Sequence, residues 1–146
     1  MAEVSTKVPA SPDRVFEVLA DGWSYVGWVV GAAHIREVDT GWPKRGTRIH
    51  HSVGPWPLLV HDVTTVHTVD RPRLLELNAR LWPFGEARIR LELTEVEPGV
   101  TEIRMTERAV RGPGRLMPHA IQALLLVPRN RESLRRLSAM VVGKTG

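Results

Sequence analysis

Cysteine is absent from the 146 residues, which excludes a disulfide framework, a thiolate zinc site and a cysteine nucleophile. Aromatic residues make up only 5% of the chain, and lysine occurs only at positions 7, 44 and 144. The longest apolar run, around residues 123–127, is far too short to cross a bilayer. The first residues show no basic stretch followed by an apolar one, so we expect a cytoplasmic protein without a membrane span.

Recognised catalytic and cofactor motifs are absent as well. No serine stands in the Gly-x-Ser-x-Gly pattern of a nucleophile elbow, and no His-Glu-x-x-His pattern supplies metal ligands. Gly112-Pro113-Gly114 indicates a turn before a helix, because no Lys-Ser or Lys-Thr follows it as in a phosphate-binding loop. We therefore expect neither a cofactor nor a metal, and the sequence identifies no catalytic residue.

Arginine dominates the charge, which is +4 with an isoelectric point of about 10.3. The densest group is Arg129, Arg131, Arg135 and Arg136, which surrounds Glu132 near the end of the chain. The favoured interpretation is a solvated helix face. The alternative is an interaction module that binds nucleic acid, protein or another anionic surface through these arginines.

The remaining composition is that of one globular domain over residues 1–146, with 42% hydrophobic residues. Residues 2–8 alternate and predict a strand, which Pro9 ends because proline cannot donate to a sheet. Ser11 is a good N-cap for a helix that Asp21 and Gly22 terminate. Residues 23–31 then predict a second short helix or turn rich in aromatic side chains.

From about residue 32 the hydrophobic pattern has a period of two, which indicates strands. Leu75 and Leu77, for example, alternate with Glu76 and Asn78, as in a sheet with one buried and one solvated face. Short turns separate these segments and predict a meander. The expected strands lie near residues 33–39, 46–53, 58–69, 73–81, 85–96 and 100–109.

The last forty residues return to helical spacing. An apolar stripe is interrupted by Pro128 but resumes in phase, which predicts one kinked helix or two nearly coaxial pieces lying on the sheet. The residues of this stripe are Met117, Ile121, Leu124, Leu134, Leu137 and Val141.

This order of elements resembles the helix-grip fold of the START-like superfamily, also called the SRPBCC or Bet v 1-like group. Within that group the chain is most similar to the polyketide cyclase/dehydrase and lipid-transport branch. The segments that carry the resemblance are "VPASPDRVFEVLAD" with the following Trp28, "GWPKRGTRIHHSVGPWP", and "NRESLRRLSAMV" in the last helix. The resemblance implies an α+β fold, with a curved antiparallel sheet of about seven strands wrapped around a long C-terminal helix.

The resemblance also implies a cavity between the sheet and the last helix that binds a hydrophobic small molecule, polyketide-like or lipidic. Aromatic side chains near the expected cavity mouth would stack on such a ligand, and apolar ones would line it. Core packing is the alternative role for each of them. The candidate ligand-binding residues are Trp28, His51, Trp56, His61, Leu77, Trp82, Ile89, Met105, Met117, Ile121 and Leu125.

Histidines supply the candidate chemistry. Strand alternation places His51 with Ile49, and His61 and His67 with Val63, on faces that would meet the cavity if they point inward. An imidazole there could serve as a general acid or base near neutral pH. Ordinary core or surface histidines are the favoured interpretation, because bulges in long strands disturb alternation.

Glu107 continues the alternation of Ile103 and Met105 and could therefore be an inward carboxylate. We expect instead that the strand has ended by this residue and that Glu107 is exposed. A buried carboxylate would need a partner, and Arg88, Arg104 or a histidine could provide one.

Two main functions follow from these features. The leading hypothesis is binding of a hydrophobic small molecule that the protein carries or sequesters. The alternative is an enzyme of the polyketide cyclase/dehydrase type that moves protons through inward histidines. A nucleic-acid partner is disfavoured, and the sequence leaves the oligomeric state open.

Overall fold

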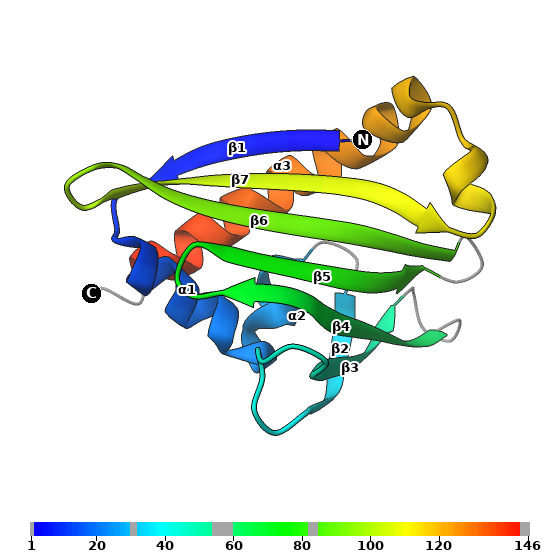
Figure 1. The fold of residues 1–146 in the computed structure, drawn as a ribbon, viewed down its shortest axis with the longest axis horizontal. Coiled ribbons are helices and arrows are strands. Elements are labelled where there is room, and N and C mark those ends of the chain that lie inside the picture. The colour runs from blue at the N-terminus through cyan, green and yellow to red at the C-terminus, as the bar shows by residue number, and fades with distance from the viewer. Residues whose placement is uncertain (1, 30–31, 54–59, 82–84, 144–146) are drawn as a thin grey trace.

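A computed structural model describes residues 2–29, 32–53, 60–81 and 85–143. Seven antiparallel strands form one sheet in the order β1-β7-β6-β5-β4-β3-β2, and a long helix crosses behind it in Figure 1. The elements are β1 (Ala2–Val8), α1 (Pro12–Ala20), η1 (Gly22–Ser24), α2 (Tyr25–Trp28), β2 (Ala32–Val38), β3 (Arg48–Val53), β4 (Val60–Asp70), β5 (Leu74–Leu81), β6 (Gly85–Glu97), β7 (Val100–Arg111), η2 (Pro113–Leu116) and α3 (His119–Gly143). The predicted α+β helix-grip architecture is confirmed.

The passage from β1 into α1 follows the local signals in the sequence. Ser11 caps the helix, because its hydroxyl accepts a hydrogen bond from the backbone N–H of Arg14 at 3.2 Å. The hydroxyl of Thr101 in β7 donates to the backbone carbonyl oxygen of Ala10 at 2.7 Å. Asp21 ends α1 and caps η1, which leads directly into α2. The two short helices are thereby held against the sheet.

The core lies between the inner face of the sheet and the three helices. Strand alternation supplies it, since Leu75 and Leu77 of β5 are each 1% exposed while Glu76 between them lies on the outer face. From the helical side, Phe16 of α1 and Leu137 of α3 are fully buried. Each such side chain contributes about 1.5–3 kcal/mol to the free energy of unfolding through its burial.

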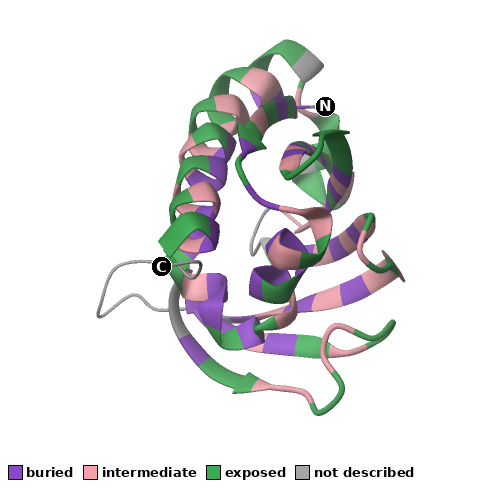
Figure 2. Ribbon diagram, turned by 90° about the vertical axis from the view of Figure 1, so that its left-hand side faces the viewer, coloured by how far each residue is buried: buried purple, intermediate pink, exposed green. Residues whose placement is uncertain are grey.

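Helix α3 runs without interruption through Pro128, so the predicted single helix is confirmed. Only its second half buries the apolar stripe, through Leu134, Leu137 and Val141. Ile121 and Leu124 are 46% and 74% exposed, which corrects the prediction that the stripe is buried throughout. Figure 2 gives the reason, since the first turns of α3 extend past the packed part of the molecule, where little covers them.

Glu107 corrects a second prediction, because β7 continues to Arg111 and this carboxylate is 1% exposed. The partner is neither of the arginines expected for it nor a histidine. Nη2 of Arg129 in α3 lies 2.7 and 2.8 Å from the two carboxylate oxygens of Glu107. Arg129 was expected on a solvated face, and its side chain is instead only 31% exposed. The ion pair joins α3 to the inner face of β7.

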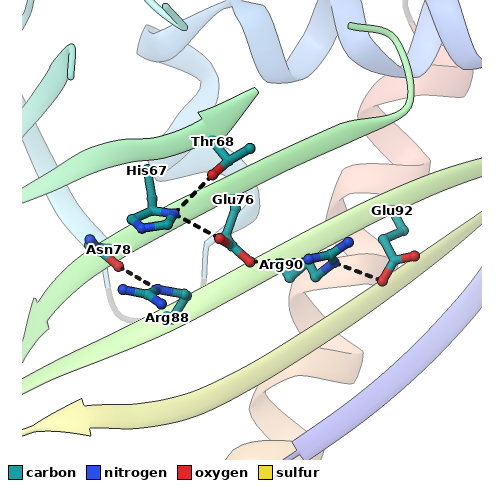
Figure 3. A network of polar contacts seen from close by, with 7 residues as sticks. All are labelled: His67, Thr68, Glu76, Asn78, Arg88, Arg90 and Glu92. Atoms are coloured by element: carbon teal, nitrogen blue, oxygen red, sulfur yellow. Dashed lines mark hydrogen bonds and ion pairs between the residues drawn. The ribbon is translucent and has the colours of Figure 1, made fainter. Parts of the chain in front are cut away.

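His67 belongs to the outer face of the sheet. The inward residues of β4 are Asp62, Thr64 and Val66, so strand alternation places His67 with Val63 and Thr65 on the opposite face. Nδ1 of His67 lies 2.8 Å from a carboxylate oxygen of Glu76, which Arg90 approaches at 3.4 Å from the other side. Figure 3 shows this row of polar side chains across β4, β5 and β6. His67 is therefore held by surface partners.

The buried ion pair leads to a prediction about stability. Arg129→Met should lower the free energy of unfolding by about 3 kcal/mol, because it leaves the Glu107 carboxylate buried and uncompensated. The double variant Glu107→Gln/Arg129→Met should regain at least about 1 kcal/mol, since neither member of the former pair is then charged. Urea denaturation followed by circular dichroism measures both values.

Arg135→Met is the matched control on the same helix. Arg135 pairs with Glu132 in an exposed site, with its side chain 72% exposed, so its removal should change the urea midpoint little. An Arg129→Met protein that unfolds at the wild-type midpoint would contradict the prediction. A double variant no more stable than the single one would contradict it equally.

Candidate functional site

The interior between the sheet and helices α2 and α3 contains polar as well as apolar side chains. Thr64 and Glu107 are 0% and 1% exposed, His51 and Tyr25 are each 4% exposed, and Asn130 is 1% exposed. Buried polar groups lower stability unless hydrogen bonds satisfy them, so each of these requires a physical account. They come from α2, β3, β4, β7 and α3, and only the tertiary fold brings them together.

Thr64 links Tyr25 and His51. The phenol oxygen of Tyr25 lies 3.2 Å from Oγ1 of Thr64, and Nε2 of His51 lies 2.9 Å from the same atom. The rings of Tyr25 and His51 are stacked with their centroids 5.6 Å apart. We call these three residues the interior polar chain. The ring of Trp28 packs edge-on against the ring of Tyr25, with the two centroids 5.5 Å apart.

The interior polar chain has one open end. Nδ1 of His51 has no hydrogen-bond partner among the described residues. If Nε2 carries the proton and donates to Thr64, the Thr64 hydroxyl can donate to the phenol oxygen of Tyr25, and Nδ1 presents a free lone pair. If the proton is on Nδ1, the Thr64 hydroxyl donates to Nε2 and the Tyr25 hydroxyl donates to the Thr64 oxygen. Nδ1–H is then the group without a partner. In either state one polar atom faces the interior unsatisfied.

Burial sets the protonation states of this chain. Burial lowers the pKa of His51 below its ordinary value of 6.5; Asp62 opposes the shift and Arg36 adds to it. Burial raises the pKa of Tyr25 to about 12, although the hydrogen bond with Thr64 opposes the shift. At neutral pH the imidazole is therefore uncharged and the phenol keeps its proton.

The Glu107–Arg129 pair belongs to the same region. The charge of Glu107 raises the pKa of Tyr25 and the charge of Arg129 lowers it, so both groups act on the phenol electrostatically. Asn130 follows Arg129 on α3, and neither its amide nitrogen nor its amide oxygen has a hydrogen-bond partner among the described residues. The interior therefore offers a neutral base, a phenol, a fixed carboxylate–guanidinium pair and an unsatisfied amide.

The structure separates the predicted ligand-binding residues into three groups. Buried in the core are Trp28, His51, Leu77, Ile89 and Met105, all less than 7% exposed. The second group lies near the start of α3. Met117 precedes the helix and is half-buried, and Ile121 and Leu125 in its first turns are 46% and 59% exposed. Outside the described residues are Trp56, Trp82 and the side chain of His61. Within the core group, His51 belongs to the interior polar chain and Trp28 packs against its Tyr25.

Sequence reasoning missed Thr64, Arg129 and Asn130 as members of the site. The inward position of Thr64 follows from the alternation of β4, in which Asp62, Thr64 and Val66 face the interior. The inward histidines predicted for this strand require the opposite alternation. Arg129 and Asn130 stand four or more residues before Leu134 and Leu137, on or beside the buried stripe of α3. That helical spacing was the available signal.

Other kinds of site find little support in the described part of the chain. No group of three or more histidine and acidic residues there could hold a metal ion, and no helix there is long and apolar enough to cross a membrane. A surface groove of about 430 Å³ lies between α1, the β4–β5 turn and β6, but none of the predicted ligand-binding residues lines it. The groove is bordered by Pro12, Arg71, Pro72, Arg73, Leu93, Thr94 and Glu95.

Comparison with solved structures identifies the fold independently. A START superfamily protein from Mycobacterium smegmatis is similar with a TM-score of 0.72 and 14% identity, over 97% of each chain. A protein from Arthrobacter aurescens is similar with a TM-score of 0.73 and 14% identity, over 97% of this chain and 85% of the other. The protein Ara h 8.0201 is similar with a TM-score of 0.66 and 11% identity, over 97% and 96%.

Sequence comparison identifies the family. A search of curated proteins found no match, and the structural similarities at these low identities show the fold alone. The family model described as polyketide cyclase / dehydrase and lipid transport, however, matches residues 1–141 of the 146. With a matching fold and a family match along nearly its whole length, this chain belongs to the polyketide cyclase/dehydrase and lipid transport family.

Proposed function

We propose that this protein binds a hydrophobic small molecule, polyketide-like or lipidic, in the interior between the sheet and α3, and carries or sequesters it. The observation that carries the proposal is the interior polar chain, which ends at an unsatisfied buried nitrogen of His51. Unsatisfied groups of this kind are rare in native interiors, and a bound ligand or a catalytic role is one explanation for such a group. Membership of a family named for cyclases and lipid transport supports the same proposal.

The arrangement favours a ligand with an apolar body and one polar end. Leu77, Ile89 and Met105 offer apolar surface from β5, β6 and β7. A carbonyl or hydroxyl oxygen of the ligand would hydrogen-bond to the open end of the interior polar chain. Such a site holds its ligand mainly by apolar burial, and the few polar groups determine its orientation.

Native mass spectrometry of the purified protein, followed by organic extraction, tests this function. We expect a copurified apolar compound, or uptake of an added one such as the fluorescent probe 1-anilinonaphthalene. Thr64→Val should weaken retention of an oxygen-bearing ligand by about tenfold, because it removes the hydroxyl that holds the imidazole of His51, and a lost ligand hydrogen bond to that ring costs roughly 1–1.5 kcal/mol. Thr65→Val, the neighbouring residue on the opposite face of β4, is the matched control and should bind normally.

An empty protein that also fails to take up the probe would contradict the binding function. Equal weakening by Thr64→Val and Thr65→Val would contradict the assigned role of the interior polar chain, because the two substitutions differ only in the face of β4 that they alter. Melting temperatures of both variants show whether either has lost its fold.

A second candidate function is proton transfer on an enolisable ligand, as in a cyclase or dehydrase. The specific observation is that one tautomer provides both groups required. With the His51 proton on Nε2, the Nδ1 lone pair can accept a proton from the carbon beside a ligand carbonyl. When the Thr64 hydroxyl donates to the phenol oxygen, the Tyr25 O–H is free to donate a hydrogen bond to the resulting enolate oxygen. The lowered pKa of His51 keeps this base uncharged at neutral pH.

Hydrogen–deuterium exchange at carbon distinguishes enzyme from carrier. The extracted ligand, or a β-diketone probe, is incubated with the protein in D2O, and deuterium incorporation is followed by mass spectrometry. For an enzyme, His51→Gln should slow incorporation by about 10²–10⁴-fold, as expected for loss of a general base. The apolar lining is unchanged, so binding should weaken by no more than about tenfold, the loss of one hydrogen bond. If the wild-type protein gives deuterium incorporation only at the uncatalysed rate, the enzymatic function is contradicted and binding without catalysis remains.

The state of His51 also makes stability depend on pH. The unfolded chain takes up a proton at His51 near its ordinary pKa of 6.5, whereas the folded chain takes it up only at lower pH. Stability should therefore fall as the pH decreases from 6.5 through the lowered pKa of the folded state. His51→Gln should flatten this part of the wild-type curve, measured by urea denaturation at several pH values. Parallel curves for the two proteins would show that His51 is not held uncharged.

A further inference from the structure

The start of α3 and the preceding η2 expose four large aliphatic side chains. Leu116 is 81% exposed, Leu124 74%, Leu125 59% and Ile121 46%. We call these four residues the α3 apolar face. They account for most of the exposed large hydrophobic residues of the described chain, the others being Trp23, Val96 and Val142. Single exposed apolar residues are ordinary, but a group of this size indicates an interaction surface.

Helical geometry places the three members of the face that belong to α3 on one side of that helix. Ile121, Leu124 and Leu125 are three and four residues apart and therefore neighbours on the helix surface. The buried residues Gln122 and Asn130 belong to the other side, which packs inward. In Figure 2 the outward side of α3 and its first turns are the exposed ones. Over these turns the large aliphatic side chains are exposed to solvent while polar side chains are buried, which is the opposite of an ordinary surface helix.

The charge around this face has one sign. Residues 108–131 contain no aspartate or glutamate, and four of their arginines, at positions 108, 111, 115 and 131, are exposed. The carboxylates that bracket this stretch are already bound. Glu107 is paired with Arg129 inside the protein, and Glu132 is paired with Arg135 and Arg136. Arg111 lies 4.0 Å from Glu86 of β6, so the exposed arginines that flank the α3 apolar face in sequence are Arg115 and Arg131, within a segment that contains no acid of its own.

We propose that the α3 apolar face docks this protein onto an anionic membrane surface, with its leucines in the headgroup–acyl boundary and its arginines at the phosphates. A helix with aliphatic residues on one side and flanking arginines is the pattern of an interfacial helix. Juxtaposed arginine and anionic lipid attract each other within about a Debye length. The helix lies on the bilayer without spanning it, in agreement with the absence of a spanning helix among the described residues.

Two other occupants fit less well. A second copy of this chain would meet the same surface across a two-fold axis and would set Arg115 and Arg131 against their own counterparts. Binding partners among proteins favour surfaces that include aromatic side chains, and this face is purely aliphatic. The docking does not depend on what the interior binds, since the residues of the two sites are different.

Vesicle sedimentation with the full-length protein tests the proposal. The probes are vesicles of phosphatidylcholine alone and vesicles with about 30% phosphatidylglycerol. We expect at least about tenfold stronger partitioning to the anionic vesicles, which rises at low salt and is largely lost near about 500 mM NaCl. Leu124→Ser/Leu125→Ser should lower the partition coefficient by at least about tenfold, because two apolar side chains no longer enter the boundary.

Val96→Ser is the matched control, because Val96 is 42% exposed on β6 and lies outside the face. It should bind like the wild type, and melting temperatures show whether each variant is folded. Arg115→Gln/Arg131→Gln should reduce binding to anionic vesicles and weaken its salt dependence. Equal binding to both kinds of vesicle, or a double-leucine variant that binds normally, would overturn the proposal.

The alternative occupants are distinguished in the same samples. Light scattering that shows a dimer, lost in Leu124→Ser/Leu125→Ser, together with no vesicle binding, would overturn the proposal in favour of a second copy. Binding to polyglutamate without binding to vesicles would overturn it in favour of an acidic protein. Equal vesicle binding by protein with and without a ligand in its interior would support a docking surface that is independent of ligand binding.

Discussion

The structure depends on covering one face of a seven-stranded antiparallel sheet. Alternation along β5, β6 and β7 places leucine and isoleucine on that face and charged residues on the other. The apolar face is stable only when helices exclude water from it, and α1, α2 and α3 are the elements available. The hydrogen bond from Thr101 to Ala10 and the buried half of α3 hold these helices in place.

Closure also creates the chemistry of the interior. Tyr25, His51 and Thr64 would be ordinary solvated residues on an open sheet, with an imidazole that titrates near 6.5. Enclosure lowers the pKa of His51 and raises the pKa of Tyr25, so that a neutral base and an intact phenol stand at the two ends of one hydroxyl. Buried groups of this kind reduce stability, and their persistence is typical of functional sites.

Helix α3 combines three tasks along its length. Its second half completes the core through Leu134 and Leu137. Its middle carries Arg129 and Asn130 into the interior, where the guanidinium neutralises Glu107. Its beginning carries aliphatic side chains away from the protein. This division explains why a single stripe drawn along the helix from the sequence describes only part of it.

Local signals in the sequence determined the elements and their order. Ser11 and Asp21 bound α1, strand alternation placed β5, β6 and β7 within two residues of their observed bounds, and the family resemblance supplied the topology. The candidate site was predicted only in part, because His51 and the core residues were named but their partners were not. The tertiary structure decided that Glu107 is buried, that Arg129 rather than an arginine nearer in sequence neutralises it, and that Asp62, Thr64 and Val66, not the histidines of β4, face inward. These outcomes depend on contacts between residues far apart in the chain, and hydrophobic periodicity, which describes one element at a time, contains no information about such contacts.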